Sequence, residues 1–400
     1  MIGSDGSRPP FPVTLDNWQT ADQLPWTFQH MAAIFPTAPI RRGDGPVARL
    51  VGTSYDGTAL PVLVPDGRQF SVGQVMGYTD TDGWMVVHDH PQRGPLVLAE
   101  RYAGGMGAST LHLMMSLSKS VVGIVAAALV AQGVVDTEAP VSHYVPALKV
   151  SGYSDATVRH LLDMRSGIYF SENYLDPTAE VRLLEQAFGW APRTTPGVPA
   201  TLREFLVTLR RCRPHGGVFE YRSCETDVLG LVAEGASGIR FPALAADLVW
   251  SRLGAEFDGN IGVDSEGTAM FDGGMSAALG DLARFGLMVL RGGSSLPGEQ
   301  VVPDWWIEDC FAGGADSRAA FAASPGDNRM PGGFYRNQFW IPDGDRPVLL
   351  CLGIHGQMIY VNRAARVVAA KLSSWPLPQD AWKLFSTVAA FDAISAEVGS

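Results

Sequence analysis

The clearest helical pattern in the chain is the Ala- and Val-rich run Val121–Val130. Apolar residues recur along it at helical spacing, no proline interrupts it, and Gly133 follows as a stop signal. The run therefore predicts a helix. It also places Ser116 and Lys119 at the head of that helix, within one turn of each other.

Strand-like runs lie on both sides of the middle of the chain. Residues 84–87 and 96–102 flank the turn-prone segment 88–95, and together they predict a β-hairpin. Near the C-terminus, short apolar runs separated by turn signals predict an antiparallel meander. These runs are residues 348–352, 358–361 and 366–372.

Helical and loop-rich patterns dominate residues 175–290. A short amphipathic helix precedes them, and a longer helix is expected to close the chain. The first fifty residues predict an irregular segment with one short helix near residues 26–35. The predicted helices are 157–164, 201–211, 226–234, one that follows Gly273 and ends near Gly292, and 380–398; residues 141–146 predict an extended connection.

This order of elements predicts an α/β (α+β) fold, with a central antiparallel sheet flanked by helices and interrupted by a mostly helical insertion. We expect residues 1–174 and 292–400 to form the discontinuous α/β domain. Residues 175–291 would form the helical domain. A site between two such units is the default expectation, so we place the active site there.

Composition narrows the class of partner. The chain has 400 residues, 46% of them hydrophobic, which suffices for a large core or two subdomains. Its formal net charge of −11 argues against nucleic acid and anionic membranes, because both select basic patches. No run approaches the length of a membrane span. The first ten residues lack the pattern of a secretory signal, so we expect a cytoplasmic protein.

Cysteines and histidines give no sign of a metal centre. The four cysteines are widely spaced without a C-x-x-C pattern, and we expect reduced structural thiols. His88 and His90 lie in a turn-prone segment with no third ligand at a supporting spacing, so a solvated loop is the better interpretation. We expect no metal and no organic cofactor.

The Ser116-x-x-Lys119 pair carries the candidate chemistry. Residues i and i+3 share one helix face, so the lysine amine can reach the serine hydroxyl. The helix N-terminus adds backbone N–H groups and a dipole that favours negative charge. The alternative is a core helix with one serine at its start and a lysine reaching out to solvent. A lysine buried in such an apolar run is costly unless paired or neutral, which favours a functional role.

Three further segments extend this pair to a family pattern. They are Tyr221-x-Ser223, Gly353-Ile-His-Gly-Gln357 and Lys371-Leu-Ser-Ser-Trp-Pro376. With Ser116-x-x-Lys119, their order and separation resemble the class C β-lactamases, related esterases and nylon-oligomer hydrolases, all β-lactamase-like serine hydrolases. The resemblance runs from about Trp26 to the C-terminus and implies a β-lactamase/transpeptidase-like fold.

The resemblance implies catalytic roles for four residues. Ser116 would be the nucleophile of an acyl-enzyme, and Lys119 and Tyr221 would supply its base, which requires a lowered pKa. Tyr221 would then pass the proton to the leaving group. The backbone N–H groups of Ser116 and Ile354 would form the oxyanion hole. A core tyrosine with a satisfied hydroxyl is the alternative for Tyr221.

Substrate contacts follow from the same resemblance. Tyr174 would close over the substrate, and Trp340 would line its pocket. Glu185 falls where amide-active members have an aspartate that attracts a terminal ammonium. Asp272 falls where a neutral Asn or His is usual, and it would either strengthen cation binding or face solvent. His355 would either touch the substrate or pack structurally.

The leading hypothesis is a serine hydrolase for short-chain carboxylic esters and for linear amides such as the 6-aminohexanoate dimer. A carboxylesterase without amidase activity is the alternative within the class. A non-catalytic relative that binds ligands is the alternative from another class, and three intact catalytic residues argue against it. A β-lactam is less expected, because residues 355–357 lack a lysine to pair with its carboxylate. The resemblance also implies a homodimer.

Overall fold

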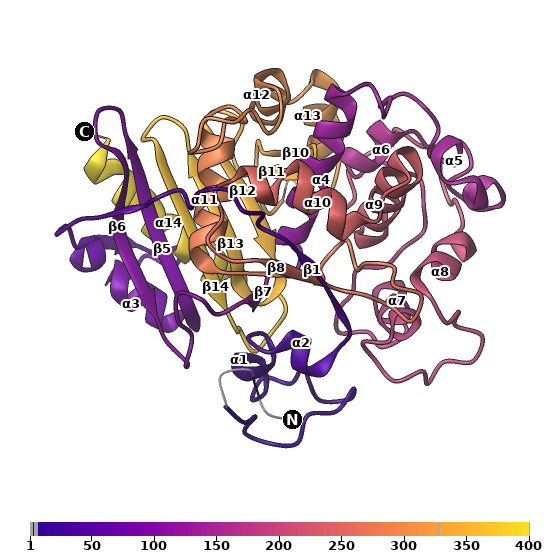
Figure 1. Cartoon of the computed structure of the whole chain (residues 1–400), viewed down its shortest axis with the longest axis horizontal. Helices are drawn as coiled ribbons and strands as arrows, with labels where there is room; N and C mark the ends of the chain where they lie inside the picture. Colours follow the sequence, from indigo (N-terminus) through magenta and orange to yellow (C-terminus); the bar gives the residue numbers. More distant parts are fainter. Residues whose placement is uncertain (1–2, 4–6, 327, 400) are drawn as a thin grey trace.

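An eight-stranded sheet forms one half of the molecule (Figure 1). The computed structural model describes residue 3, residues 7–326 and residues 328–399. The predicted hairpin and the predicted meander are both confirmed, and the two meet where β14 pairs with β5. In sheet order the strands are β10 Phe334–Arg336, β11 Phe339–Ile341, β12 Val348–Gly353, β13 Gln357–Asn362, β14 Val367–Ser373, β5 Thr81–His90, β6 Gly94–Tyr102 and β2 Val51–Gly52.

The sheet is mixed rather than purely antiparallel. Every pair of neighbours is antiparallel except the last, where β2 runs parallel to β6. A two-residue edge strand carries too little alternation to be recognised in the sequence. The prediction of an antiparallel sheet is therefore correct for all but this edge.

Side chains alternate between two buried layers on either face of the sheet. In β14, Val368 and Ala370 join the large core, whereas Val367 and Ala369 join a smaller one. Helix α11 (Leu279–Leu290) packs on the first face against β13, β14 and β5. On the second face, α14 (Ala381–Val398) packs with α3 (Val72–Tyr78). The sheet is thus covered on both faces, which explains why its strands are continuously apolar.

The other half of the molecule is helical and is centred on α4 (Leu117–Ala131), the helix predicted from the Val121–Val130 run. It is buried from Leu117 to Leu129 and packs against α9 and α10. The helices of this half are α5 Val141–Tyr144, α6 Val158–Leu162, α7 Glu180–Phe188, α8 Leu202–Thr208, α9 Ser223–Ser237 and α10 Phe241–Leu248 (Figure 1).

The predicted division of the chain at residues 175 and 291 stays a prediction. Packing crosses both proposed boundaries. Helices α4, α5 and α6 precede residue 175 and pack against α9 or its neighbours, while α11 lies before residue 291 and packs on the sheet.

A second, four-stranded sheet was not expected from the sequence. Its order is β1 (Thr37–Ile40), β8 (Gly259–Gly262), β9 (Met275–Ala277) and β7 (His112–Leu113). Strands of two to four residues, two of them in a helix-rich segment, are too short to show periodicity. Pairing of β7 with β9 brings the chain before Ser116 beside the chain after Asp272.

Two local predictions were wrong. Residues 141–146 are not extended, because α5 makes one helical turn after Pro140 before Pro146 starts the short helix η2 (Pro146–Val150). The single helix expected near residues 26–35 is two one-turn helices.

The remaining elements are α1 Leu24–Thr27, α2 Met31–Ile34, α12 Asp304–Ala312, α13 Ala315–Ala322, β3 Pro61–Leu63, β4 Gln69–Ser71, η1 Gly57–Ala59, η3 Trp250–Arg252 and η4 Ile354–Gly356.

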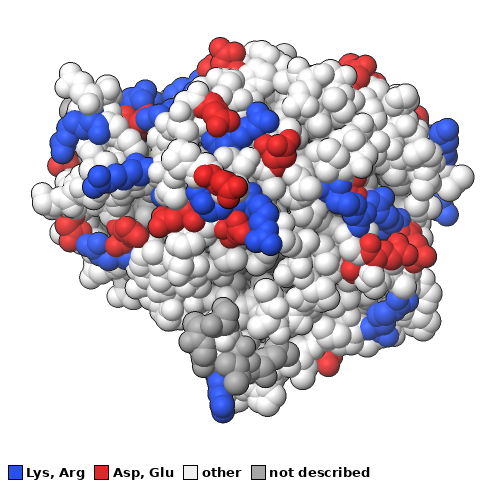
Figure 2. Space-filling view, viewed as in Figure 1, with Lys and Arg blue, Asp and Glu red and all other residues white. Residues whose placement is uncertain are grey.

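Other whole-chain predictions concern thiols, charge and membrane spans. All four cysteines are free, as expected. Figure 2 shows basic and acidic side chains interspersed over one face of the molecule. Among the described residues, no single helix has the length and apolar character needed to cross a membrane. The segments Ser223–Ser237 and Phe241–Arg252 meet that test only together, as a pair bent by 80°.

Lys371 on β14 generates a prediction about stability and pH. Its side chain is fully buried, and its amine donates to the Thr79 carbonyl (3.2 Å) and to the Ser373 hydroxyl. Burial lowers the pKa of Lys371 from 10.5 to about 7. The unfolded chain therefore binds more protons than the folded chain between pH 7 and 10.5, so this residue makes the free energy of unfolding rise with pH in that window.

We expect the wild type to gain stability relative to Lys371→Met as the pH rises from 6 to 9. Urea unfolding of both proteins at each pH measures the difference. An exposed lysine replaced in the same way, Lys149→Met, should show no such trend. A pH-independent difference between the wild type and Lys371→Met would contradict the prediction.

Candidate active site

Ser116 and Lys119 meet at the start of α4, as their spacing predicts. Ser116 is the N-cap of the helix, and its side chain makes no capping hydrogen bond. Its Oγ instead accepts a hydrogen bond from Lys119 Nζ at 2.9 Å. Met115, the preceding residue, has a φ of +47°, in the left-handed region that non-glycine residues rarely adopt. The chain thus bends sharply just before the proposed nucleophile.

The Lys119 amine is buried and fully hydrogen-bonded. Besides Ser116, it donates to Ser223 Oγ (3.1 Å) and to the Asp272 carbonyl (2.7 Å), and the Asp272 carboxylate lies 3.5 Å away. Burial opposes the charged form, but the Coulombic attraction of the surrounding acidic groups outweighs it and raises the pKa of Lys119. The expected lowering of this pKa is therefore wrong for the resting site, where Lys119 is an ammonium.

Tyr221 stands between the amine and the aromatic wall of the site. Its ring stacks on Trp340 with centroids 5.3 Å apart, and Lys119 Nζ lies 5.3 Å from its ring centroid. Burial raises the pKa of Tyr221, although the Lys119 charge and hydrogen bonding to Ser116 counteract part of that rise. The resting Tyr221 side chain is therefore a neutral phenol, and the expectation of a tyrosinate is wrong for the resting site. Trp340, on β11, lies beside Tyr221, and its role in lining the substrate pocket stays a prediction.

Ile354 begins the loop η4 at the end of β12, directly beside the chain that leads into Ser116. A Cβ added to Gly353 would lie 2.7 Å from the carbonyl oxygen of Met114. Within the described part of the chain, neither the Ser116 N–H nor the Ile354 N–H donates to a protein acceptor. Two backbone donors without acceptors, on adjoining segments, fit the predicted oxyanion hole.

His355 packs as a structural part of this loop. It is buried with a φ of +62°, its Nδ1 donates to the Trp375 carbonyl at 2.6 Å, and its ring meets Phe28 edge-on. Burial lowers the pKa of His355 to about 4, so the ring is neutral. Its Nε2 is buried and lacks a hydrogen-bond partner among the described residues. A substrate contact through that atom stays a prediction.

Tyr174 and Glu185 are joined by an arginine that sequence reasoning missed. Arg182 donates to the Tyr174 carbonyl from Nε (2.9 Å) and Nη2 (2.7 Å), and its Nη1 pairs with both Glu185 oxygens at 2.8 and 2.7 Å. Gln19 also donates to Glu185. The i, i+3 spacing of Arg182 and Glu185 on α7 is a signal that could have revealed this pair. Because its charge is already paired, Glu185 is a weaker partner for a substrate ammonium.

Asp272 faces Lys119, so the alternative that it faces solvent is wrong. Its backbone N–H donates to Oδ1 of Asp227, a fully buried residue on α9 that sequence reasoning also missed. Glu172 is a third carboxyl group here, accepting from the Ser223 N–H and hydrogen-bonded to Tyr174. Burial raises the pKa of Glu172 and raises that of Asp227 well above its ordinary value. One lysine thus lies among three carboxyl groups.

A buried ion pair supports the Tyr221–Ser223 segment from behind. Arg222 Nε lies 3.1 Å from Glu225 Oε1, and its Nη atoms donate to the Ser166 and Ile168 carbonyls. Burial raises the pKa of Glu225 to about 7. Ile168 begins the loop that carries Glu172 and Tyr174. Arg222 therefore links this loop to the Tyr221–Ser223 segment.

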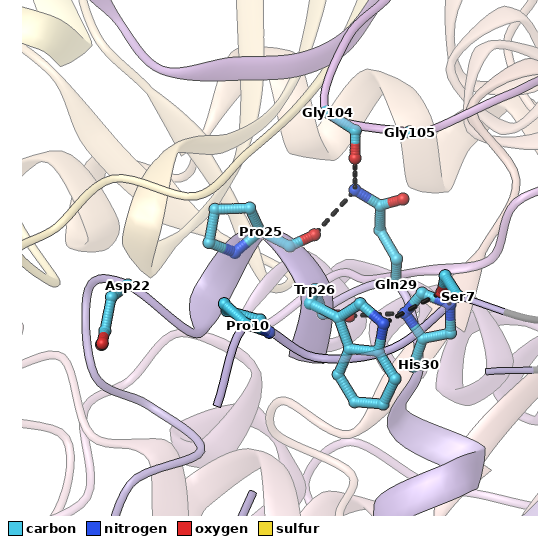
Figure 3. A pocket seen from close by; sticks show the side chains of 9 residues that line it. All are labelled: Ser7, Pro10, Asp22, Pro25, Trp26, Gln29, His30, Gly104 and Gly105. Atoms are coloured by element: carbon cyan, nitrogen blue, oxygen red, sulfur yellow. Dashed lines mark hydrogen bonds between the residues drawn. The ribbon is translucent and has the colours of Figure 1, made fainter. Parts of the chain in front are cut away.

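A metal centre and a pocket near the N-terminus are the two other possible sites. No group of three or more His, Cys, Asp or Glu side chains suited to a metal occurs in the described ranges. A pocket of about 150 Å³ lies near the N-terminus, where Ser7 Oγ, His30 Nε2 and Trp26 Nε1 are hydrogen-bonded at 3.0 Å (Figure 3). None of the predicted site residues lines that pocket.

Comparison with known proteins gives the family of the chain. The beta-lactamase family model matches residues 92–385. The chain is 38% identical over 372 residues to 6-aminohexanoate-dimer hydrolase of Paenarthrobacter ureafaciens, covering 91% of this chain and 89% of that protein. Both matches include Ser116, Lys119 and Tyr221 by extent.

Solved structures give the fold. A Bacillus anthracis protein provisionally assigned as a 6-aminohexanoate-dimer hydrolase superposes with a TM-score of 0.87 at 24% identity, covering 98% of both chains. A family VIII carboxylesterase superposes with a TM-score of 0.55 at 14% identity, covering 80% of this chain and 96% of the other. The predicted β-lactamase/transpeptidase-like fold is confirmed, and the chain belongs to the beta-lactamase family of hydrolases, as a relative of 6-aminohexanoate-dimer hydrolase.

Proposed function

We propose that this hydrolase forms an acyl-enzyme on Ser116 and cleaves short-chain carboxylic esters and linear amides such as the 6-aminohexanoate dimer. The observation that carries the proposal is the contact of Ser116 Oγ with Lys119 Nζ at 2.9 Å, beside Tyr221. A nucleophile, a proton carrier and two unused backbone donors meet there. The relative from Paenarthrobacter ureafaciens supports the amide substrate by its name.

The reaction would proceed in two halves. Once the Lys119 ammonium has lost one proton to solvent, Ser116 Oγ attacks the acyl carbon while its proton passes to the Lys119–Tyr221 pair. The Ser116 and Ile354 N–H groups stabilise the oxyanion. Tyr221 then protonates the leaving amine or alcohol as its bond to the acyl carbon breaks. Water attacks the acyl-enzyme in the second half, which releases the acid and restores the Ser116 hydroxyl.

Tyr174 supports amide cleavage in particular. It lies close enough to Glu172 and Tyr221 for both to raise its pKa, after burial as the main cause, so its phenol stays protonated as a hydrogen-bond donor. An amine leaves less readily than an alcohol, and an added donor near the leaving nitrogen assists its departure.

A carboxylesterase without amidase activity is the second candidate. The observation that favours it is the ion pair of Arg182 with Glu185, which neutralises the carboxylate expected to attract the ammonium of the dimer. Esters need only the Ser116 site, so this pairing would leave them unaffected.

A cytoplasmic location and a homodimer also stay predictions.

Assays of the wild type and of Ser116→Ala with an amide and an ester substrate test these functions. We expect the variant to lose at least about 10³-fold in kcat, both for release of 6-aminohexanoate from its linear dimer and for p-nitrophenyl acetate, because the nucleophile is gone. If the wild type cleaves only the ester, the carboxylesterase candidate is correct. Ester activity retained in full by Ser116→Ala would overturn the proposed function.

Tyr221→Phe tests the proton carrier. The variant keeps the ring that stacks on Trp340 and removes only the hydroxyl. We expect kcat for both substrates to fall by about 10²–10⁴-fold, with little change in KM. Tyr335→Phe is the matched control, since Tyr335 also packs on Trp340 with centroids 5.0 Å apart. Equal losses in the two variants would argue for a packing role only.

Gly353→Ala tests the oxyanion loop. The added methyl group would push against the Met114 carbonyl and separate η4 from the chain before Ser116. We expect a loss of about 10²-fold in kcat, comparable to the removal of one oxyanion donor. Gly52→Ala on the edge strand β2 meets nothing within 4 Å and serves as the control. Unchanged kcat in Gly353→Ala would remove Ile354 from the oxyanion hole.

A further inference from the structure

All three N–H bonds of the Lys119 ammonium are committed in the resting site. Its acceptors are Ser116 Oγ, Ser223 Oγ and the Asp272 carbonyl, at 2.9, 3.1 and 2.7 Å. A lysine ammonium has three donors and no acceptor. While it stays charged, Lys119 therefore cannot accept the proton of Ser116.

The nearest negative charge is the carboxylate of Asp272, with Oδ2 at 3.5 Å from Lys119 Nζ. Only 1% of the Lys119 side chain and 12% of the Asp272 side chain are exposed, so water screens the pair weakly. Asp272 Oδ1 is buried and has no hydrogen-bond partner among the residues described. The lysine is thus the main charged group that stabilises this carboxylate.

Asp227 does not compete for the role of counter-ion. It is fully buried, its Oδ1 accepts the Asp272 N–H at 3.1 Å, and its Oδ2 lacks a partner within the described ranges. Burial, followed by repulsion from Asp272, raises the pKa of Asp227 well above its ordinary value. Of two carboxyl groups this close, one stays protonated, and it is the one farther from solvent.

We propose that Asp272 is a positioning residue that acts through Lys119: its carboxylate holds the amine in the charged form and thereby sets the pH above which Ser116 can be activated. The proposal rests on the proposed function of Ser116 and Lys119. It assigns Asp272 to the proton chemistry of the site, instead of to substrate recognition. In it, the ammonium loses one proton to solvent as the pH rises, and the neutral amine then accepts the proton of Ser116.

Glu172 also attracts the amine, but more weakly than Asp272 does. Glu172 already accepts from the Ser223 N–H, and burial raises its pKa, so it carries less charge. Tyr221 is a neutral phenol that hydrogen-bonds to Ser116, so it adds no negative charge. The groups that face the Lys119–Asp272 pair are Glu172 and Tyr174 from the loop after Ile168, Tyr221 from the chain before α9, and Asp227 from α9.

The test is the pH profile of kcat/KM for p-nitrophenyl acetate, with Ser116→Ala as the blank. This ester has no ammonium, so a role of Asp272 in binding a cationic substrate cannot influence the result. We expect the acidic limb of the wild type to lie above about pH 8 and the limb of Asp272→Asn to lie about one to three units lower. At pH 7 the variant would then be about tenfold or more faster.

Two matched variants sharpen the comparison. Asp272→Glu keeps the charge and should keep the limb of the wild type. Asp155→Asn removes an exposed carboxylate, paired with Arg211, and should leave the profile unchanged. Near-UV circular dichroism checks that each variant is folded.

Three results would overturn the proposal. They are an acidic limb that does not move in Asp272→Asn, an acidic limb that moves to higher pH in that variant, and an acidic limb near pH 6 in the wild type itself. An unchanged acidic limb together with a raised KM for the linear dimer would mean that Asp272 binds the substrate ammonium instead. Failure of the proposed function looks different, since Ser116→Ala would then still cleave the ester.

Discussion

The buried charge of Lys119 is the constraint around which this hydrolase is arranged. An isolated ammonium in such an environment would cost many kcal/mol, so its partners must be in place when the chain folds. Those partners come from three segments: Ser116 at the head of α4, Ser223 at the start of α9, and Asp272 before β9. The amine therefore holds these three segments together, and in the proposed mechanism it also takes part in the chemistry.

Short strands hold two of these segments in register. Leu113 in β7 pairs with Ser276 in β9, and the next residue, Met114, donates to the Met275 carbonyl at 2.8 Å. Two residue pairs thus place the chain before Ser116 against the chain after Asp272. On the other side, β12 delivers η4 to the same place, where Gly353 allows close contact with Met114. The positions of the proposed oxyanion donors depend on both contacts.

Much of this arrangement could be predicted from the sequence, and the parts that could not share one physical cause. Long periodic segments such as α4, the β5–β6 hairpin and the C-terminal meander follow from local pattern, as does the Ser116–Lys119 contact. The four-stranded sheet and the placement of the Asp227 carboxyl group beside Lys119 depend on contacts between distant segments. The charge of Lys119 was mispredicted for the same reason, because the carboxyl groups that set it lie 53 to 153 residues away in the sequence.

The balance of charge in the site argues against anionic substrates of the kind that some members of the beta-lactamase family cleave. A β-lactam carboxylate needs a free cation, and each described candidate nearby is engaged or neutral. Lys119 is paired with Asp272, Arg182 with Glu185, and the His355 ring is uncharged. Lys371 lies on the face of β14 that α14 covers, since its strand neighbours Val367 and Ala369 belong to that core. The lack of a free cation among these described groups instead favours substrates that are neutral or cationic near the scissile bond.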